Sequence, residues 1–137
     1  MPPIFDLRIV APDRPVYEGR VQSLVAPGAE GYFGVLFGHA PMVAQLQSGE
    51  FKLVDDRGQT RYFAISGGFL EVAALEQVNV VADAAEPAEE IDVARAKAAE
   101  ARAKERLAAR EENTDYTRAR AALQRALTRL DVAGKSG

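Results

Sequence analysis

Glycine and proline are divided very unevenly along this chain. All seven prolines and nine of the eleven glycines lie at or before Pro87, whereas residues 88–133 contain neither. Both residue types interrupt regular structure, so a long run without them favours uninterrupted helix, and a punctuated run favours short strands and turns. The sequence therefore predicts two architectures in one polypeptide, with a boundary near Pro87.

The segment before this boundary has the pattern of short strands. Residues 4–10 alternate between apolar and polar side chains, as in a strand with one buried face. Further strand-like segments follow at residues 16–26, 51–54 and 61–65, and turn-forming residues separate them. Many short strands with frequent turn signals are typical of a sandwich or a flattened barrel. We therefore expect residues 1–87 to form an N-terminal antiparallel β-sandwich.

The segment after the boundary changes to a helical period. Apolar residues recur at helical spacing from Val93 to Leu107 and again from Tyr116 to Leu130. A short polar connection between two helices predicts an antiparallel hairpin, which we place at residues 88–137. The fold class is thus α+β with the two parts segregated. Because the first helix buries mostly alanine, which removes little apolar area from water, we expect the hairpin to dock weakly and reversibly.

Composition narrows the classes of function. Residues 1–87 carry six Lys or Arg and eleven Asp or Glu, and residues 88–133 carry ten and nine, so no basic excess typical of nucleic-acid binding is present. The chain has no cysteine and only one histidine, His39, which excludes a His/Cys zinc site. No apolar run is long enough to cross a bilayer, and we see no secretory signal sequence.

Arginines form the charged pattern with the clearest geometry. Arg95 and Arg102 lie seven residues apart, so they share one face of the first predicted helix. Arg125 and Arg129 lie one turn apart on the second helix. If antiparallel packing brings these guanidinium groups together, a polyphosphate that accepts bidentate hydrogen bonds relieves their repulsion. The spacing alone favours the other interpretation, a solvated face with ion pairs inside each helix.

Two acidic residues near the domain boundary complete this pattern. Glu86 and Asp92 would accept hydrogen bonds from the ribose or the base of a nucleotide held by the arginines. Asp92 also stands where it can act as the N-cap of the first helix. These residues therefore have a structural interpretation beside the functional one.

Three motifs in this chain are similar to those of a known family. The run Gly31-Tyr32-Phe33-Gly34-Val35-Leu36-Phe37-Gly38-His39-Ala40-Pro41 resembles the glycine-rich signature of the epsilon subunits of F-type ATP synthases. Residues 64–72 resemble the second hallmark of that family, and residues 88–92 resemble its domain junction. The resemblance covers essentially the whole chain in the right order. Phe37 stands where the family usually has proline.

The resemblance implies a non-catalytic rotor subunit of the central stalk, peripheral to the cytoplasmic face of a bacterial inner membrane or the stromal face of a thylakoid. The sandwich would bind the gamma subunit and the c-ring, with membrane contact only through the complex. The hairpin would alternate between a compact state on the sandwich and an extended state along gamma that reaches the alpha and beta subunits and blocks ATP hydrolysis. The partner-binding residues that follow are Gly31, Phe33, Gly34, Leu36, Phe37, Gly38, His39 and Pro41.

The resemblance also implies ATP as a regulatory ligand, with no metal required. Residues 91–96 resemble the motif with which some bacterial epsilon subunits bind ATP in the compact state. The matching residues are Glu86, Asp92, Arg95, Arg102, Arg125 and Arg129. For the isolated chain we expect the compact state, since no gamma subunit is there to hold the extended one.

Two other interpretations remain open at this point. One is a free-standing nucleotide sensor whose hairpin signals to an unrelated partner. The other is a small hydrolase that uses His39 or Ser66, but a nucleophile elbow requires glycine where this chain has Ala64.

Overall fold

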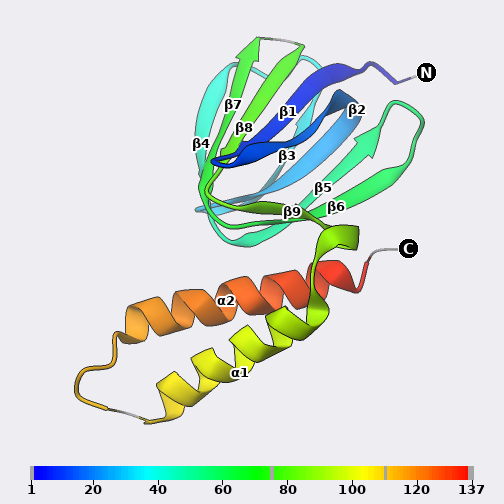
Figure 1. The fold of residues 1–137 in the computed structure, drawn as a ribbon. Coiled ribbons are helices and arrows are strands. Elements are labelled where there is room, and N and C mark those ends of the chain that lie inside the picture. The colour runs from blue at the N-terminus through cyan, green and yellow to red at the C-terminus, as the bar shows by residue number, and fades with distance from the viewer. Residues whose placement is uncertain (1, 75, 110, 136–137) are drawn as a thin grey trace.

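The computed structural model describes residues 2–74, 76–109 and 111–135. A body of strands carries the N-terminus, and a pair of helices lies against one end of it (Figure 1). The strands are β1 (Phe5–Ala11), β2 (Arg14–Gly28), β3 (Gly31–Leu36), β4 (Met42–Leu46), β5 (Gly49–Asp55), β6 (Thr60–Ile65), β7 (Gly68–Ala74), β8 (Gln77–Ala82) and β9 (Ala85–Pro87). A 3₁₀ turn, η1 (Ala88–Glu90), leads to α1 (Val93–Ala109) and α2 (Tyr116–Ala133). The predicted fold class is confirmed.

Alternation of apolar and polar residues builds the strands, as the first strand shows. Phe5, Leu7 and Ile9 of β1 are buried, whereas Asp6 and Arg8 between them are exposed. Side chains of the same kind from the other strands enclose one core: Val21, Leu24, Ala26, Val35, Leu46, Phe51, Leu53, Phe63, Ile65, Leu70, Val72, Val78, Val80, Ala82 and Ala85. Every member belongs to a strand, so the body of strands contains its own hydrophobic core without the helices.

The long strand β2 closes the sheet on itself. Its first half pairs with β1, and its second half lies between β3 and β5. The pairing with β5 shifts register between Val21 and Ser23, at the point where β2 changes partners. Strand β1 then pairs with β8 in parallel, while the other strand pairs run antiparallel. The sandwich is therefore a flattened barrel with one parallel pair in an otherwise antiparallel sheet.

Each helix begins at an aspartate. Asp92 precedes α1, and its Oδ1 accepts a hydrogen bond from the backbone N–H of Arg95 at 3.1 Å. Asp115 does the same for α2, accepting from the N–H of Arg118 at 3.0 Å. Such caps satisfy one of the backbone N–H groups that a helix start leaves without an intrahelical partner. Asp92 is thus an N-cap, as the sequence pattern predicts.

The hairpin is folded against the sandwich, in the compact arrangement expected for the isolated chain. In Figure 1, α2 lies nearer the strands and α1 packs on its other side. Alanines bring the helices together, since Ala96, Ala103, Ala119 and Ala126 are buried. A small second cluster joins the two parts; it contains Ala64, Ala88, Ile91 and Val132, with Tyr62 and Ala133 partly buried against it.

Candidate functional site

A pocket of about 400 Å³ lies where the hairpin meets the sandwich. The two helices supply most of its wall, and the ends of β6 and the segment around β9 supply the rest. The lining residues are Ala64, Ile65, Ser66, Ala84, Glu86, Ala99, Arg102, Ala103, Arg106, Ala122, Arg125, Ala126, Thr128 and Arg129. The pocket therefore exists only while the hairpin is docked.

Alanine accounts for the hollow between the helices. Ala99 and Ala103 lie one turn apart on α1, and Ala122 and Ala126 lie one turn apart on α2. A methyl group allows the helix backbones to approach closely but leaves the space above it empty. Two rows of alanine thus form an apolar floor, and the longer side chains beside them form a charged rim.

Four arginines supply that rim. Arg102 and Arg106 come from α1, and Arg125 and Arg129 come from α2, each pair at the i, i+4 spacing of one helix face. Glu86 is the single acidic residue among the lining residues. Four guanidinium groups facing one carboxylate make the pocket strongly positive, and the fork geometry of arginine suits the oxygens of phosphate groups.

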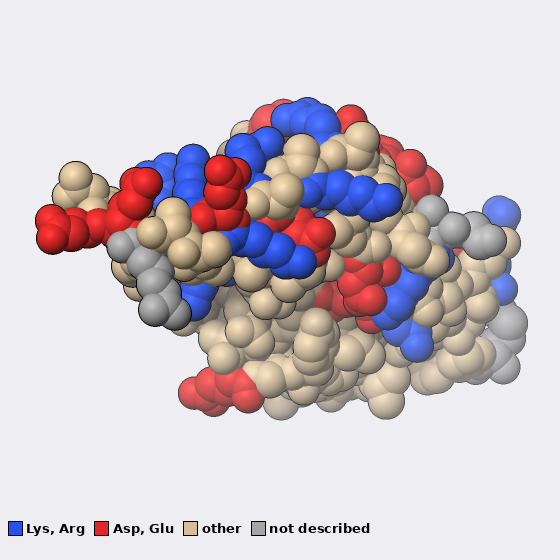
Figure 2. All heavy atoms as spheres, turned by 90° about the horizontal axis from the view of Figure 1, so that it is seen from below, with Lys and Arg blue, Asp and Glu red and all other residues tan. Residues whose placement is uncertain are grey.

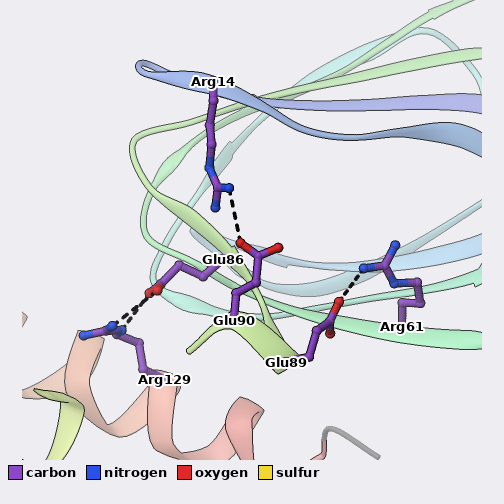
Figure 3. Close-up of polar contacts among 6 residues, drawn as sticks. All are labelled: Arg14, Arg61, Glu86, Glu89, Glu90 and Arg129. Atoms are coloured by element: carbon purple, nitrogen blue, oxygen red, sulfur yellow. Dashed lines mark hydrogen bonds and ion pairs between the residues drawn. The ribbon is translucent and has the colours of Figure 1, made fainter. Parts of the chain in front are cut away.

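Glu86 connects the sandwich to the hairpin across this pocket. Its Oε1 lies 2.7 Å from Nε of Arg129, and its Oε2 accepts a hydrogen bond from Nη2 of Arg129 at 3.3 Å (Figure 3). The Nε contact is close but poorly aligned, so this buried N–H has no hydrogen-bond acceptor of good geometry. The side chain of Arg129 is about three-quarters buried, and that of Glu86 is about two-thirds buried. Solvent therefore screens this ion pair less than it screens a pair on the surface.

The structure gathers four of the six predicted nucleotide-binding residues around one pocket. Glu86, Arg102, Arg125 and Arg129 line it, and they come from β9, α1 and α2. Asp92 and Arg95 lie outside the lining. The lining residues of α1, Ala99 to Arg106, lie about two to four turns further along the helix than Asp92, whose carboxylate is occupied as a helix cap.

Arg106 lines the pocket but is absent from the predicted set. The sequence contains a signal that would have found it, because Arg106 follows Arg102 at the same four-residue spacing that separates Arg125 from Arg129.

The outward face of the hairpin differs from the pocket in its distribution of charge. Figure 2, viewed from the side of the helices, shows Lys and Arg interspersed with Asp and Glu there.

The predicted partner-binding residues form β3 and the loop that follows it. Gly31, Gly34, Leu36, Phe37, Gly38 and Pro41 are exposed, His39 is half-buried, and Phe33 packs partly against the core. The backbone N–H of His39 donates to the carbonyl oxygen of Leu36 at 3.1 Å, which closes a tight turn. Gly38 has φ +83° in that turn, and Phe37 occupies the preceding position, where proline is favoured in type II turns.

Large apolar side chains are also exposed on strands β4, β7 and β8. Leu36 is 65% exposed and Phe37 is 40% exposed. Val43 of β4, Phe69 of β7 and Val81 of β8 are also exposed, and Phe69 lies directly opposite Val81 in the sheet. We call Val43, Phe69 and Val81 the outer apolar strip. Large apolar side chains that gather on one face mark a surface for a protein partner.

The single histidine has a local structural role. Its Nδ1 lies 2.8 Å from the carbonyl oxygen of Ala40. Because a carbonyl oxygen can only accept a hydrogen bond, Nδ1 carries the proton and donates it. Across the described ranges, no group of three or more His, Asp or Glu side chains is arranged to hold a metal ion. Neither helix, in the part of the chain that the structure describes, has the length and apolar character needed to span a membrane.

Comparison with known proteins accounts for both parts of the chain. Residues 4–88 match the family described as "ATP synthase, Delta/Epsilon chain, beta-sandwich domain", and residues 89–134 match its "long alpha-helix domain". The chain belongs to the ATP synthase epsilon-chain family. Members of this family are subunits of ATP synthase other than the catalytic one. The hydrolase interpretation is therefore not supported.

Individual epsilon chains are similar over nearly their whole length. The ATP synthase epsilon chain of Bacillus velezensis is 50% identical over 128 residues, which cover 93% of this chain and 96% of the relative. That of Syntrophobacter fumaroxidans is 50% identical over 131 residues, covering 95% and 96%. Length and domain order are thus shared, which supports the assignment to the epsilon-chain family for the sandwich and the hairpin together.

Solved structures agree with the family assignment. A chain in the cryo-EM structure of the Euglena gracilis mitochondrial ATP synthase, which contains OSCP, F1 and the c-ring, superposes with a TM-score of 0.78 at 27% identity. The match covers 90% of this epsilon chain and 78% of that one. A chain in the central stalk and c-ring of the Tetrahymena thermophila mitochondrial enzyme has a TM-score of 0.63 at 10% identity, which shows the shared fold alone.

Proposed function

We propose that this epsilon chain is a rotor subunit of the ATP synthase central stalk. Its sandwich binds the gamma subunit and the c-ring, and its hairpin restrains ATP hydrolysis when it leaves the sandwich and extends toward the alpha and beta subunits. The observation that carries this proposal is the way the hairpin is attached. The sandwich has its own core, and the helices are joined to it by a small separate cluster and by ion pairs such as that of Arg129 with Glu86. Such an element can change position without unfolding its support.

The exposed apolar residues of the sandwich support the first half of the proposal. Leu36 is the last residue of β3 and Phe37 follows it, and the outer apolar strip crosses three other strands of the same body. Burial of such side chains provides most of the free energy of a typical interface, and large aromatic residues contribute the most. Phe37, which replaces a small rigid proline, therefore adds an aromatic contact to the partner surface.

Charge substitution at Phe37 tests this partner surface. Phe37→Asp should weaken binding of the purified chain to a gamma subunit and c-ring complex by about tenfold or more, because a carboxylate is desolvated in an apolar contact. The measurement is surface plasmon resonance with the complex immobilised. Val93→Asp is the matched control, since Val93 on α1 is 41% exposed and Phe37 is 40% exposed. Equal affinity of the two variants would contradict the proposed surface.

The pocket supports a nucleotide as the regulator of the hairpin. Its volume of about 400 Å³ falls in the range of about 300–1,000 Å³ typical of small-ligand sites. The four arginines repel one another, and a triphosphate that bridges them links α1 to α2. Glu86 adds the sandwich to the same site. ATP that contacts all three elements binds the docked state better than the extended state.

This difference in affinity determines how strongly ATP acts on the equilibrium. A ligand shifts two conformations only by the ratio of its affinities for them. Because the extended state separates the helices from Glu86 and the strands, the pocket is incomplete there. A fall in ATP concentration therefore releases the hairpin, and a rise returns it to the sandwich.

Thermal denaturation tests the nucleotide site. At one hundred times its dissociation constant, ATP should raise the Tm of the isolated chain by about 5–10 °C, since binding contributes about 2.7 kcal/mol. Arg102→Ala together with Arg125→Ala should abolish this shift. Arg118→Ala with Arg120→Ala is the matched control, because these arginines lie on α2 outside the pocket lining.

A further variant defines the extent of the site. Arg95→Ala should reduce the shift if the site reaches beyond the pocket lining to the start of α1, as the family motif implies. Isothermal titration calorimetry gives the affinity directly for each variant. No heat of binding at millimolar ATP would exclude the nucleotide and leave the rotor function standing.

A further inference from the structure

We infer that Lys135, Glu50 and Tyr62 form an electrostatic latch that holds the hairpin on the sandwich independently of any nucleotide. Lys135 lies two residues beyond the end of α2, whereas Glu50 and Tyr62 lie on β5 and β6. The inference rests on the proposed mobility of the hairpin, and it adds the contact that sets the docked population when the pocket is empty.

The contacts of Lys135 define the latch. Its Nζ donates a hydrogen bond to Oε1 of Glu50 and lies 5.3 Å from the centroid of the Tyr62 ring. Asp131, one turn earlier on α2, places Oδ2 3.9 Å from the same Nζ. The ammonium group thus has a carboxylate and an aromatic face on the sandwich side and a second carboxylate on its own helix. The hydrogen bond to Glu50 raises the pKa of Lys135 above its usual value, which favours the charged ammonium form.

The position of the latch gives it influence over the whole hairpin. The other contacts between α2 and the sandwich also lie near the C-terminal end of α2: Arg129 pairs with Glu86, and Val132 is buried among Ala64, Ala88 and Ile91. The turn between α1 and α2 lies at the opposite end of the hairpin, away from the strands (Figure 1). The hairpin is therefore held at one end, and loss of a contact there affects the docking of both helices.

The latch is separate from the nucleotide pocket. None of Lys135, Glu50 and Tyr62 belongs to the pocket lining. A half-exposed ion pair and a cation–π contact are each weak in water, and together they change an equilibrium by about fivefold. A contact of this size suits a reversible switch. It favours docking without preventing release, and nucleotide then acts on an equilibrium that is already near balance.

A distance measurement on the isolated chain without nucleotide tests the latch. The chain contains no cysteine, so Gln59→Cys in the sandwich and Thr117→Cys at the start of α2 give two specific sites for spin labels. Double electron–electron resonance then separates docked from undocked distances. Lys135→Ala should raise the ratio of undocked to docked molecules by about fivefold. Lys135→Glu, which also adds a carboxylate next to those of Glu50 and Asp131, should raise it by about tenfold.

Charge exchange and a matched control make the result specific. Lys135→Glu combined with Glu50→Lys should restore most of the docked population, because the ion pair re-forms in the opposite sense. Lys104→Glu is the control, since Lys104 pairs with Glu100 within α1 at 3.6 Å. Circular dichroism establishes that the sandwich of each variant is folded. The proposed latch would be overturned if Lys135→Glu and Lys104→Glu gave equal distance distributions. It would also be overturned if the charge-exchanged double variant did not recover the docked population.

Failure of the proposed function has a different signature. In that case the Lys135 variants would still change the distances, yet the chain would bind neither the gamma subunit nor ATP. If instead the latch is wrong and the function right, ATP still narrows the distance distribution of the unsubstituted chain while Lys135→Glu leaves it unchanged.

Discussion

Single glycines determine whether the strands can meet where they do. Gly68 begins β7 with φ +108°, a conformation that side chains with a Cβ rarely adopt. A Cβ at this position would lie 2.1 Å from the carbonyl oxygen of Val81 on the neighbouring strand. Gly68 of the second family motif is thus required by close approach of two backbones, whereas a Cβ at Gly67, which has φ +75°, would meet the side chain of Asp83.

Substitution of Gly68 should therefore be far more harmful than substitution of an ordinary glycine. We expect Gly68→Ala to lower the free energy of unfolding by about 2–4 kcal/mol, through backbone strain and a clash with backbone that cannot yield. Gly34→Ala is the control, because the nearest atom to its added Cβ would be 3.6 Å away. Urea denaturation followed by circular dichroism measures both, and similar midpoints would refute this role of Gly68.

Among the elements, the turn η1 follows the last strand but is attached to the sandwich by ion pairs. Glu89 pairs with Arg61 of β6 at 2.7 Å, and Glu90 pairs with Arg14 of β2 at 3.2 Å (Figure 3). Ile91, the next residue, is buried in the small cluster. When the hairpin moves, η1 should stay behind, and the change of direction should occur between Ile91 and the helix cap.

Truncated chains test this assignment of η1. A chain of residues 1–91 should be more stable than one of residues 1–87 by about 1–2 kcal/mol, since it keeps two ion pairs and the burial of Ala88. Equilibrium unfolding in urea gives the difference. Glu89→Ala with Glu90→Ala in the longer chain should remove part of the gain. Identical midpoints for the two truncated chains would place the hinge at Pro87 instead.

At the scale of the whole molecule, two separate clusters of buried residues decide what can move. The core of the sandwich contains residues from strands alone, and the small cluster around Val132 holds the hairpin. Undocking therefore exposes only the small cluster, the pocket and the latch. Under the proposed function, this division lets a chain of 137 residues combine a rigid partner-binding body with a regulatory element that changes position.

The amino-acid sequence by itself determined the two architectures, the cap of the first helix and the family, because glycine, proline, aspartate and apolar spacing act over a few residues. It also pointed to the arginine faces of both helices, since a four- or seven-residue spacing is a property of one helix. Only the tertiary structure decided that Arg102 and Arg106 line the pocket while Asp92 and Arg95 lie outside its lining. It alone brought Lys135 to Glu50, 85 residues away. Such contacts depend on how the helices dock on the sheet, and no local pattern specifies that geometry.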